Sequence, residues 1–446
     1  MTLRERVQGK PWYRWYALGM LTLVFTSSHV DRQIMGMLLQ PIKLELGATD
    51  TQMGFLVGLT FALFYATLGM PLAMLADRSN RRNIITGALV IWSGMTALCG
   101  YAATFFQLAL ARIGVGVGEA GSTPPSHALI ADLFPPEIRG TAMGIFALGV
   151  NFGLLIAYLG GGLLSEMWGW RATFIAVGLP GLVIAVWFYF TVSEPVRGAS
   201  ESRRPPVDAQ APSLREVWSY LWRVKSLRHT CAGAALAGFT GYGFVLWMPT
   251  FLQRSYGLSP AETGLTLAVM SGLVGGLGTF VAGKLVDVLA ARDERWRAWV
   301  VAVGKAVYVP FLVAFFMMDD FESALVVYLV PAFFGGFYLA PTFALIQGLV
   351  DVRMRAVASS ITLFILNIVG MGFGPQLVGI VSDLFAPAYG QESLRMALLF
   401  LGVVNFWCAW HYYLAGRTLH EAREALRSSS GPALTPGSNM NQGRSD

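Results

Sequence analysis

The sequence predicts an all-α integral membrane protein with twelve transmembrane helices in two pseudo-symmetric six-helix bundles. Composition is the first reason: of 446 residues, 55% are hydrophobic and only 13% are charged, unlike a soluble globular domain. The second reason is a series of long apolar runs along the whole chain. The third is an internal repeat that divides these runs into two sets.

Each apolar run is close to the length of about 20 residues that a helix needs to cross a bilayer. The runs are continuously apolar, whereas strands of a membrane β-barrel alternate apolar and polar residues, so a barrel is excluded. Helices satisfy the backbone hydrogen bonds inside hydrocarbon. The predicted spans cover residues 15–39, 52–75, 84–104, 107–131, 141–165, 171–192, 230–253, 262–286, 298–317, 323–348, 357–382 and 394–415.

The basic residues predict the orientation of these spans, because Lys-rich and Arg-rich connections stay in the cytoplasm. With both termini cytoplasmic, 25 of the 32 basic residues fall on the cytoplasmic side. We therefore expect a multi-pass protein of the cell inner membrane. Its net charge of +6 follows from this topology and from contact with anionic membrane lipids, so a nucleic-acid partner is rejected. The opposite connections contain only Lys43, Arg171, Arg254 and Arg395.

The chain divides into an N-terminal bundle (1–192), a cytoplasmic linker (193–228), a C-terminal bundle (229–416) and a cytoplasmic tail (417–446). The linker is polar and rich in Pro, Ser and Arg. The segment 47–50 with Gly54 recurs as 257–260 with Gly264, 210 positions later. Parallel repeats of this kind place a solute cavity at the interface of the two halves, near the middle of the membrane.

A charged motif follows the second span. The segment 75–82 reads Leu-Ala-Asp-Arg-Ser-Asn-Arg-Arg and resembles the loop signature G-x-L-x-D-R-x-G-R-R of the major facilitator superfamily. This resemblance implies a cytoplasmic gate that holds neighbouring helix ends together. The alternative is that the charges only mark a hydrated, positive-inside loop. The predicted gate residues are Asp77, Arg78, Arg81 and Arg139, with repeat counterparts at Asp287 and Arg355.

The ionisable residues inside predicted spans include Asp31 and Arg32 in the first span and Arg112 and Glu119 in the fourth. Charges are costly there and usually face a cavity or a partner. Arg112 and Glu119 are seven residues apart and therefore share one helix face. Asp31 lies at a depth that lets it pair with Arg112. The segment 112–120 is similar to the superfamily signature R-x-x-x-G-x-G, which is associated there with proton coupling.

We expect Asp31, Arg112 and Glu119 to couple transport to protons and, together with Arg32, to bind the substrate. Burial favours a neutral carboxyl group and a nearby Arg favours the ionised one, so an Arg that moves makes protonation depend on conformation. The alternative is a permanent ion pair that only joins the two helices. Lys305, expected near the inner end of the ninth span, is predicted to extend toward lipid head groups.

Several first-half motifs together look like the spinster-like branch of this superfamily: Asp31-Arg32, 61–65, 111–120, 132–136 and 169–171. The resemblance implies a secondary active transporter that works by alternating access and moves an amphiphilic lipid, either a lysophospholipid or a molecule similar to sphingosine-1-phosphate. The charges of the first half and the apolar spans of the second fit a head group on one side and an acyl chain on the other. We expect a monomer without a cofactor.

Two other transport functions stay open, a proton-coupled carrier of a small organic anion and a multidrug exporter. Arg32 and Arg112 suit a carboxylate equally well. An enzyme is rejected, with no catalytic residues assigned, because the spans hold no Ser-His-Asp set and no phosphate-binding loop. They also hold no cluster with metal-ligand spacing, so no metal is expected.

Overall fold

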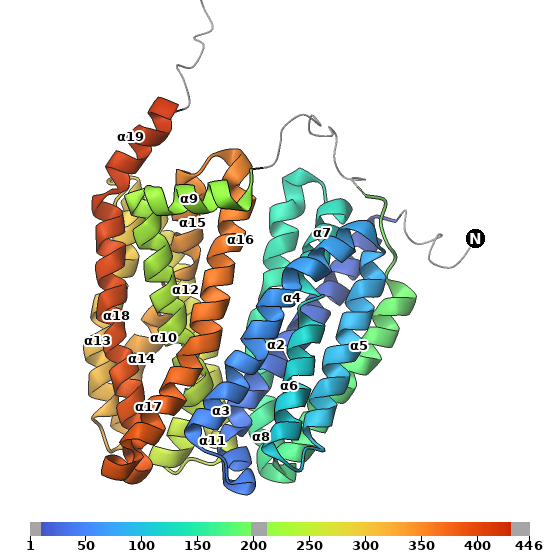
Figure 1. Ribbon diagram of the computed structural model, residues 1–446, viewed down its shortest axis with the longest axis vertical. Coiled ribbons are helices and arrows are strands. Elements are labelled where there is room, and N and C mark those ends of the chain that lie inside the picture. Colours follow the sequence, from blue (N-terminus) through green and yellow to red (C-terminus); the bar gives the residue numbers. More distant parts are fainter. Residues whose placement is uncertain (1–9, 198–211, 430–446) are drawn as a thin grey trace, which may run out of the picture.

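The computed structural model describes residues 10–197 and 212–429. Within these ranges the chain is helical and contains no strand. Two helix bundles stand side by side, with α9 and α19 at one end (Figure 1). We call this end the terminal face and the opposite end, where α3 and α11 begin, the distal face. Much of the predicted linker and the last part of the predicted tail lie outside the described residues.

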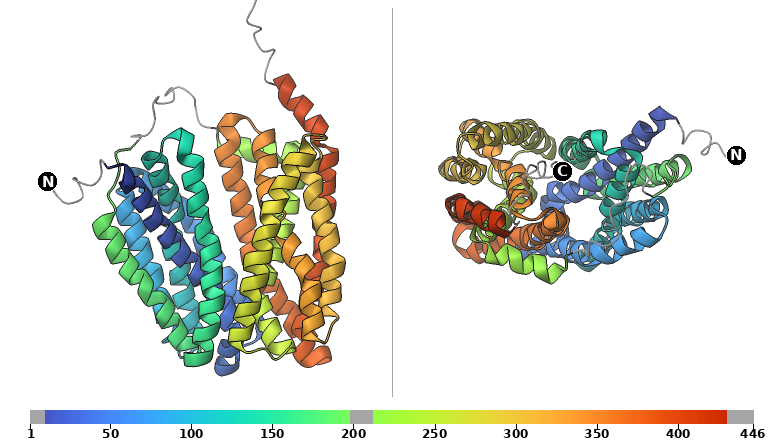
Figure 2. Two further views of the ribbon diagram at one scale, coloured as in Figure 1. Left: turned by 180° about the vertical axis from the view of Figure 1, so that it is seen from behind. Right: turned by 90° about the horizontal axis from the view of Figure 1, so that it is seen from above.

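The first bundle forms from seven helices that follow each other along the chain. Views from behind and from above show it separate from the second bundle toward the terminal face (Figure 2). Its helices are α2 (Pro11–Leu46), α3 (Asp50–Val57), α4 (Leu59–Arg78), α5 (Arg81–Cys99), α6 (Phe105–Glu119), α7 (Thr123–Leu133) and α8 (Pro136–Thr191).

The second bundle begins with the short amphipathic helix α9, which lies across the terminal face (Figure 1). Two π-helical segments, η1 and η3, interrupt its longer helices, a feature often found near functional sites. Its elements are α9 (Leu214–Arg223), α10 (Lys225–Ser255), α11 (Pro260–Leu267), η1 (Ala268–Val274), α12 (Gly275–Ala290), α13 (Trp296–Phe316), α14 (Phe321–Gly335), α15 (Leu339–Leu349), η2 (Val352–Met354), α16 (Arg355–Ile365), η3 (Leu366–Phe373), α17 (Gly374–Tyr389), η4 (Gly390–Glu392), α18 (Ser393–Arg417) and α19 (Leu419–Ser429).

The internal repeat predicted at the distal face is visible in the backbone. Gly47 ends α2 with φ 62°, and Gly257 follows α10 with φ 67°, a left-handed conformation that glycine adopts at little cost. Each glycine precedes a capping box, formed by Thr49 with Gln52 and by Ser259 with Glu262. The same turn chemistry therefore starts α3 and α11.

Two predicted spans are broken in the middle. The span 107–131 contains α6, a turn after Glu119, and α7; the span 323–348 contains α14, a turn after Gly335, and α15. In the first case Pro124 and Pro125 lack the backbone N–H that would continue the helix. Both breaks occur at matching places in the two halves, which extends the internal repeat.

Seven helical stretches in the described residues are long and apolar enough to cross a membrane. Two of them, 136–191 and 357–417, each contain two of the predicted spans. The backbone leaves the helical conformation within these stretches, with φ 75° at Gly169 and φ 57° at Gly390. The count of twelve spans stays a prediction.

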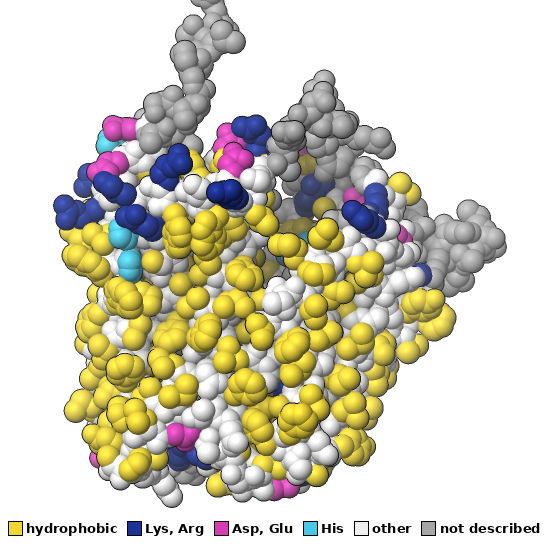
Figure 3. All heavy atoms as spheres, in the orientation of Figure 1, with side chains coloured by type: hydrophobic (Ala, Val, Ile, Leu, Met, Phe, Trp, Pro, Cys, Tyr) yellow, Lys and Arg dark blue, Asp and Glu magenta, His cyan; other side chains and the backbone are white. Residues whose placement is uncertain are grey.

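The two bundles meet closely toward the distal face. A Cβ atom on Gly54 of α3 would lie 2.7 Å from the carbonyl oxygen of Pro375, and one on Gly162 of α8 would lie 2.5 Å from that of Pro260. A cluster of buried apolar side chains also joins α2 to α10, and it includes Met37. Toward the terminal face, the surface is hollowed between the bundles (Figure 3).

Candidate functional site

An ion pair between two helices lies at the centre of the first bundle. The Nε of Arg32 on α2 lies 2.5 Å from the Oε2 of Glu119 at the end of α6. The side chain of Glu119 is fully buried, and that of Arg32 is 15% exposed. The guanidinium also lies 4.5 Å from the ring centroid of Tyr65 and 5.0 Å from that of Phe61. Aromatic faces stabilise a cation in a site with little water.

Asp31 is buried beside this pair, but its carboxylate does not pair with Arg112 as expected. An Nη of Arg112 donates instead to the backbone oxygen of Asp31, at 3.2 Å. Within the described residues its carboxylate oxygens form no ion pair and no hydrogen bond of good geometry, and the Trp92 indole nitrogen and Thr96 hydroxyl of α5 are the polar groups that lie beside them. Consecutive residues of a helix point about 100° apart. The predicted depth of Asp31 and Arg32 in the membrane therefore did not reveal which of the two faces α6.

A cavity of about 530 Å³ lies between the bundles, within the range of small-molecule sites. The first bundle contributes Gln33, Asn151, Leu154 and Tyr158 to its lining, and the second contributes the larger part. Arg32 is adjacent in sequence to Gln33 and interacts electrostatically with Tyr242, which lines the cavity. The charged cluster thus approaches the cavity through Arg32, whereas Asp31, Arg112 and Glu119 lie deeper in the first bundle.

The expectation that Lys305 extends to lipid head groups is wrong. Lys305 is 2% exposed and lines the cavity. It lies near the middle of α13, which runs from Trp296 to Phe316, so it is about two and a half turns from the start of the helix and about three turns from its end. Its ammonium lies 4.9 Å from the ring centroid of Tyr308 and 5.5 Å from that of Tyr338.

The predicted gate residues of the first half lie at the terminal face. Arg81 is buried and forms ion pairs with Asp132 of α7 at 2.6 Å and with Glu194, just after the end of α8, at 2.7 Å. The Nε of Arg139 donates to the backbone oxygen of Phe134 at 3.3 Å. These contacts join the ends of α5, α7 and α8 to one another.

Three other predicted gate residues are less constrained. Arg78 is exposed, as are Asp287 at the end of α12 and Arg355 at the start of α16. No ion pair joins Asp287 to Arg355 in the described part of the chain. The side chain of Asp77 lies outside the described residues. Its pairing with Arg139, and the gate as a whole, therefore stay predictions.

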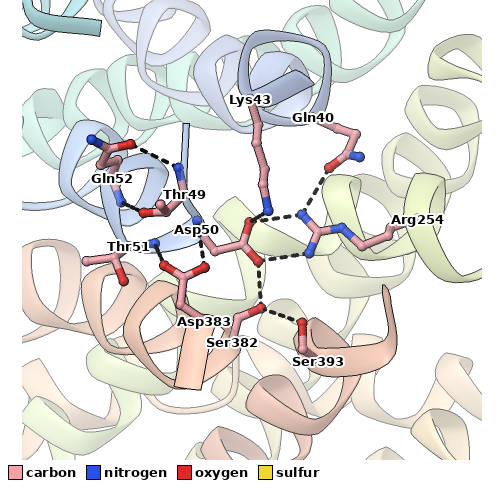
Figure 4. Close-up of polar contacts among 10 residues, drawn as sticks. All are labelled: Gln40, Lys43, Thr49, Asp50, Thr51, Gln52, Arg254, Ser382, Asp383 and Ser393. Atoms are coloured by element: carbon pink, nitrogen blue, oxygen red, sulfur yellow. Dashed lines mark hydrogen bonds and ion pairs between the residues drawn. The ribbon is translucent and has the colours of Figure 1, made fainter. Parts of the chain in front are cut away.

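The distal face contains an ionic network that the sequence did not suggest (Figure 4). Asp50, the first residue of α3, accepts hydrogen bonds from both Nη atoms of Arg254 on α10, at 2.8 and 3.0 Å. It also pairs with Lys43 at 2.6 Å and accepts a hydrogen bond from Ser382 of α17 at 2.6 Å. The side chains of Asp50 and Arg254 are only 2% and 8% exposed.

A second carboxylate extends this network across the two bundles. Asp383 of α17 accepts hydrogen bonds from the backbone N–H groups of Asp50 at 3.0 Å and Thr51 at 2.7 Å. These N–H groups have no partner within their own helix, and a carboxylate at a helix N-terminus is favourable. Asp383 therefore caps a helix of the opposite bundle. We call Lys43, Asp50, Arg254, Ser382 and Asp383 the distal lock.

All four basic residues predicted opposite the termini are ion-paired. Lys43 and Arg254 pair with Asp50, and Arg395 pairs with Asp319 and Glu392. Arg171 pairs with Glu45, which also accepts a hydrogen bond from Trp170 at 2.6 Å. The hydrogen bonds from Trp170 and Arg171 hold the pKa of Glu45 below its usual value.

Several known proteins are similar to this chain. Residues 21–375 match the family description Major Facilitator Superfamily. An "MFS-type efflux pump" of Mycolicibacterium smegmatis is 36% identical over 402 residues, covering 89% of this chain and 92% of the relative. A "Probable L-galactonate transporter" of Escherichia coli K12 is 27% identical over 424 residues, covering 91% and 90%.

A solved structure is also similar over nearly its full length. It is described as a bacterial homologue of the human lysosomal transporter spinster in an inward-facing and unoccupied conformation. The TM-score is 0.86 and the identity 31%, with 93% of this chain and 99% of the other covered. The chain therefore belongs to the major facilitator superfamily, as a spinster-like transporter rather than an enzyme.

Proposed function

We propose that this protein is a proton-coupled secondary active transporter of the inner membrane that moves an amphiphilic lipid by alternating access. The observation that carries the proposal is the carboxyl group of Asp31, which is buried next to the Arg32–Glu119 ion pair and has no ion pair of its own among the described residues. An isolated carboxylate is costly away from water, whereas a protonated carboxyl group is not. Asp31 therefore holds a proton in this conformation.

The terminal face is the cytoplasmic face in this proposal, as the distribution of basic residues predicts. The close contacts at the distal face then seal the periplasmic side, and the protein is inward-facing. The similar solved structure is described as inward-facing, which supports this orientation. The predicted boundaries of the two bundles, with the linker between them, are part of the same proposal.

Coupling follows from a competition for Arg32 and Arg112. When the bundles rock, either Arg side chain moves relative to Asp31 and Glu119, and the carboxylate that loses its cation takes up a proton. The gate residues Asp77, Arg81 and Arg139, with Asp287 and Arg355 in the second half, would close the cytoplasmic side in the opposite conformation. Solute and proton then exchange on alternate sides of the membrane.

The lining of the cavity supports an amphiphilic solute. The second bundle contributes Phe244, Met248 and several tyrosines, which suit an acyl chain, and Lys305, which suits an anionic group. We propose a lysophospholipid or a molecule similar to sphingosine-1-phosphate. The similarity to an efflux pump supports export as the direction of transport.

A small organic anion is the second candidate. The buried ammonium of Lys305 in the cavity and the similarity to a probable galactonate transporter both favour it. Both candidate solutes carry an anionic group, and only the lipid also carries an acyl chain.

Transport into proteoliposomes tests the proposal. Fluorescent lysophosphatidate and radiolabelled galactonate are supplied separately, with and without an imposed pH gradient. We expect the gradient to drive lysophosphatidate accumulation by the wild type. Asp31→Asn and Glu119→Gln should abolish the response to the gradient, and Glu45→Gln, which removes a distal ionisable group, should retain it.

Two results would reject the proposal in different ways. Normal gradient-driven accumulation by both central variants would eliminate their role in coupling. Accumulation of galactonate without any lysophosphatidate transport would replace the amphiphilic substrate with the small anion.

A further inference from the structure

We propose that Lys305, which lies between the rings of Tyr308 and Tyr338 in the second bundle, is the binding site for the anionic group of the transported solute, a carboxylate or a phosphate. This inference rests on the proposed transport function and specifies its substrate subsite. It places the charged end of the solute beside the second bundle, opposite to the arrangement that the sequence suggested.

The first argument is the isolation of the Lys305 charge. The side chain is 2% exposed, and no ion pair or hydrogen bond of its ammonium occurs within residues 10–197 and 212–429. The faces of Tyr308 and Tyr338 stabilise a cation but do not neutralise it. A buried ammonium without a counter-ion is costly, and an arriving anion removes that cost.

The second argument is the position of this ammonium. Lys305 is the one charged residue among the described residues that line the cavity, so an anion that enters meets no opposing carboxylate. The hydroxyl-bearing side chains of Tyr242, Tyr308, Tyr328 and Tyr338 line the same cavity. Tyrosine hydroxyls donate hydrogen bonds to carboxylate or phosphate oxygens, as the three N–H groups of the ammonium do.

The third argument is the contrast with the first bundle. Arg32 is already neutralised by Glu119 at 2.5 Å, and the guanidinium of Arg112 donates to a backbone oxygen. Both cations are thus engaged within their own bundle. Among the described residues that line the cavity, Lys305 is the cation that remains available to a solute.

Equilibrium binding to the purified full-length protein in detergent tests the inference. The probes are lysophosphatidate and galactonate, each compared with an uncharged counterpart, monoacylglycerol and galactose. Lys305→Met keeps the length of the side chain and removes the charge. Lys284→Met is the matched control, because Lys284 is exposed on α12 and does not line the cavity.

We expect Lys305→Met to weaken binding of the anionic probe by roughly 10-fold to 100-fold, as expected for lost hydrogen bonds to a charged group. Binding of the uncharged counterpart should stay within about twofold. Lys305→Arg should restore most of the affinity, which also shows that the position tolerates substitution. Lys284→Met should bind both kinds of probe like the wild type.

The outcomes separate this inference from the proposed function. If wild type binds galactonate only, and Lys305→Met loses it, the anionic subsite holds while the amphiphilic substrate is wrong. If Lys305→Met binds lysophosphatidate as tightly as wild type does, the inference is overturned while the amphiphilic substrate stands. Equal loss of the anionic and uncharged probes would also overturn it, because that result indicates a packing role.

Discussion

Asp50→Asn should release the distal lock and shift the protein toward a conformation that is open at the distal face. The substitution keeps the shape of the side chain and removes its charge, so Arg254 and Lys43 lose their shared counter-ion. The buried Arg254 and the partly exposed Lys43 then repel each other. The cap that Asp383 provides to α3 uses backbone N–H groups and survives the change.

The size of this shift follows from the contacts between the bundles. Arg254 donates twice to Asp50, and Ser382 donates once. Hydrogen bonds to charged groups contribute about 1.5 to 3 kcal/mol each, but an Asn oxygen retains part of this and water replaces the rest in the open state. We take about 2 kcal/mol as the net loss, which corresponds to a roughly 30-fold change in the equilibrium between the two conformations.

Distance measurement between spin labels by pulsed electron resonance tests this prediction. Labels at Tyr101 and Leu384 report on the distal face, since these exposed residues lie just after α5 and in the second half of α17, in different bundles. The three buried cysteines are first replaced by Ala: Cys99, Cys231 and Cys408.

Asp50→Asn should increase the population with a long Tyr101–Leu384 distance. Glu45→Gln is the control, because it removes the same charge at the same face but breaks an ion pair within one bundle. An unchanged distance distribution in Asp50→Asn would refute the role of the lock, as would an equal response of the control.

Two further substitutions test the packing at each face. Gly379→Ala places a methyl group against the backbone of α3, so it should favour the open distal face and slow transport. Gly19→Ala is the control, because a methyl group there meets nothing within 4 Å and transport should stay normal. Flux measured in proteoliposomes compares the two variants. Arg81→Met removes the cation that Asp132 and Glu194 share and should lower the free energy of unfolding of the first bundle by about 2 kcal/mol. This loss is smaller than that for breaking a fully buried ion pair, because both carboxylates are partly exposed. A drop in the thermal unfolding temperature of the purified protein measures this, and an unchanged temperature contradicts it.

Residue patterns predicted the features of the fold that depend on local chemistry. The glycine turns at Gly47 and Gly257 repeat because each must adopt a left-handed conformation before a capped helix. The spacing of Arg112 and Glu119 placed both on one face of the fourth span, and both interact with the charges of the first span. Helical periodicity fixes such relations within one element.

Contacts between different helices could not be predicted from the sequence in the same way. The partners of Asp31 and Arg32 depend on how α2 is rotated against α6. A residue's position along a predicted span does not determine this rotation. Whether Lys305 faces lipid or the cavity depends on how α13 is rotated against its neighbours, which the distance of Lys305 from a predicted span edge does not reveal. The distal lock joins residues more than 200 positions apart, and Asp50 looked like an ordinary helix-start residue.

Simultaneous measurement of both faces is the most direct test of alternating access. A second label pair at positions 140 and 348 reports on the terminal face, where a side chain at Gly140 or Gly348 meets nothing within 4 Å. In proteoliposomes, a pH gradient together with lysophosphatidate should shorten the 140–348 distance while lengthening the 101–384 distance. Distances that change in the same direction at both faces, or that do not respond, would contradict alternating access in this protein.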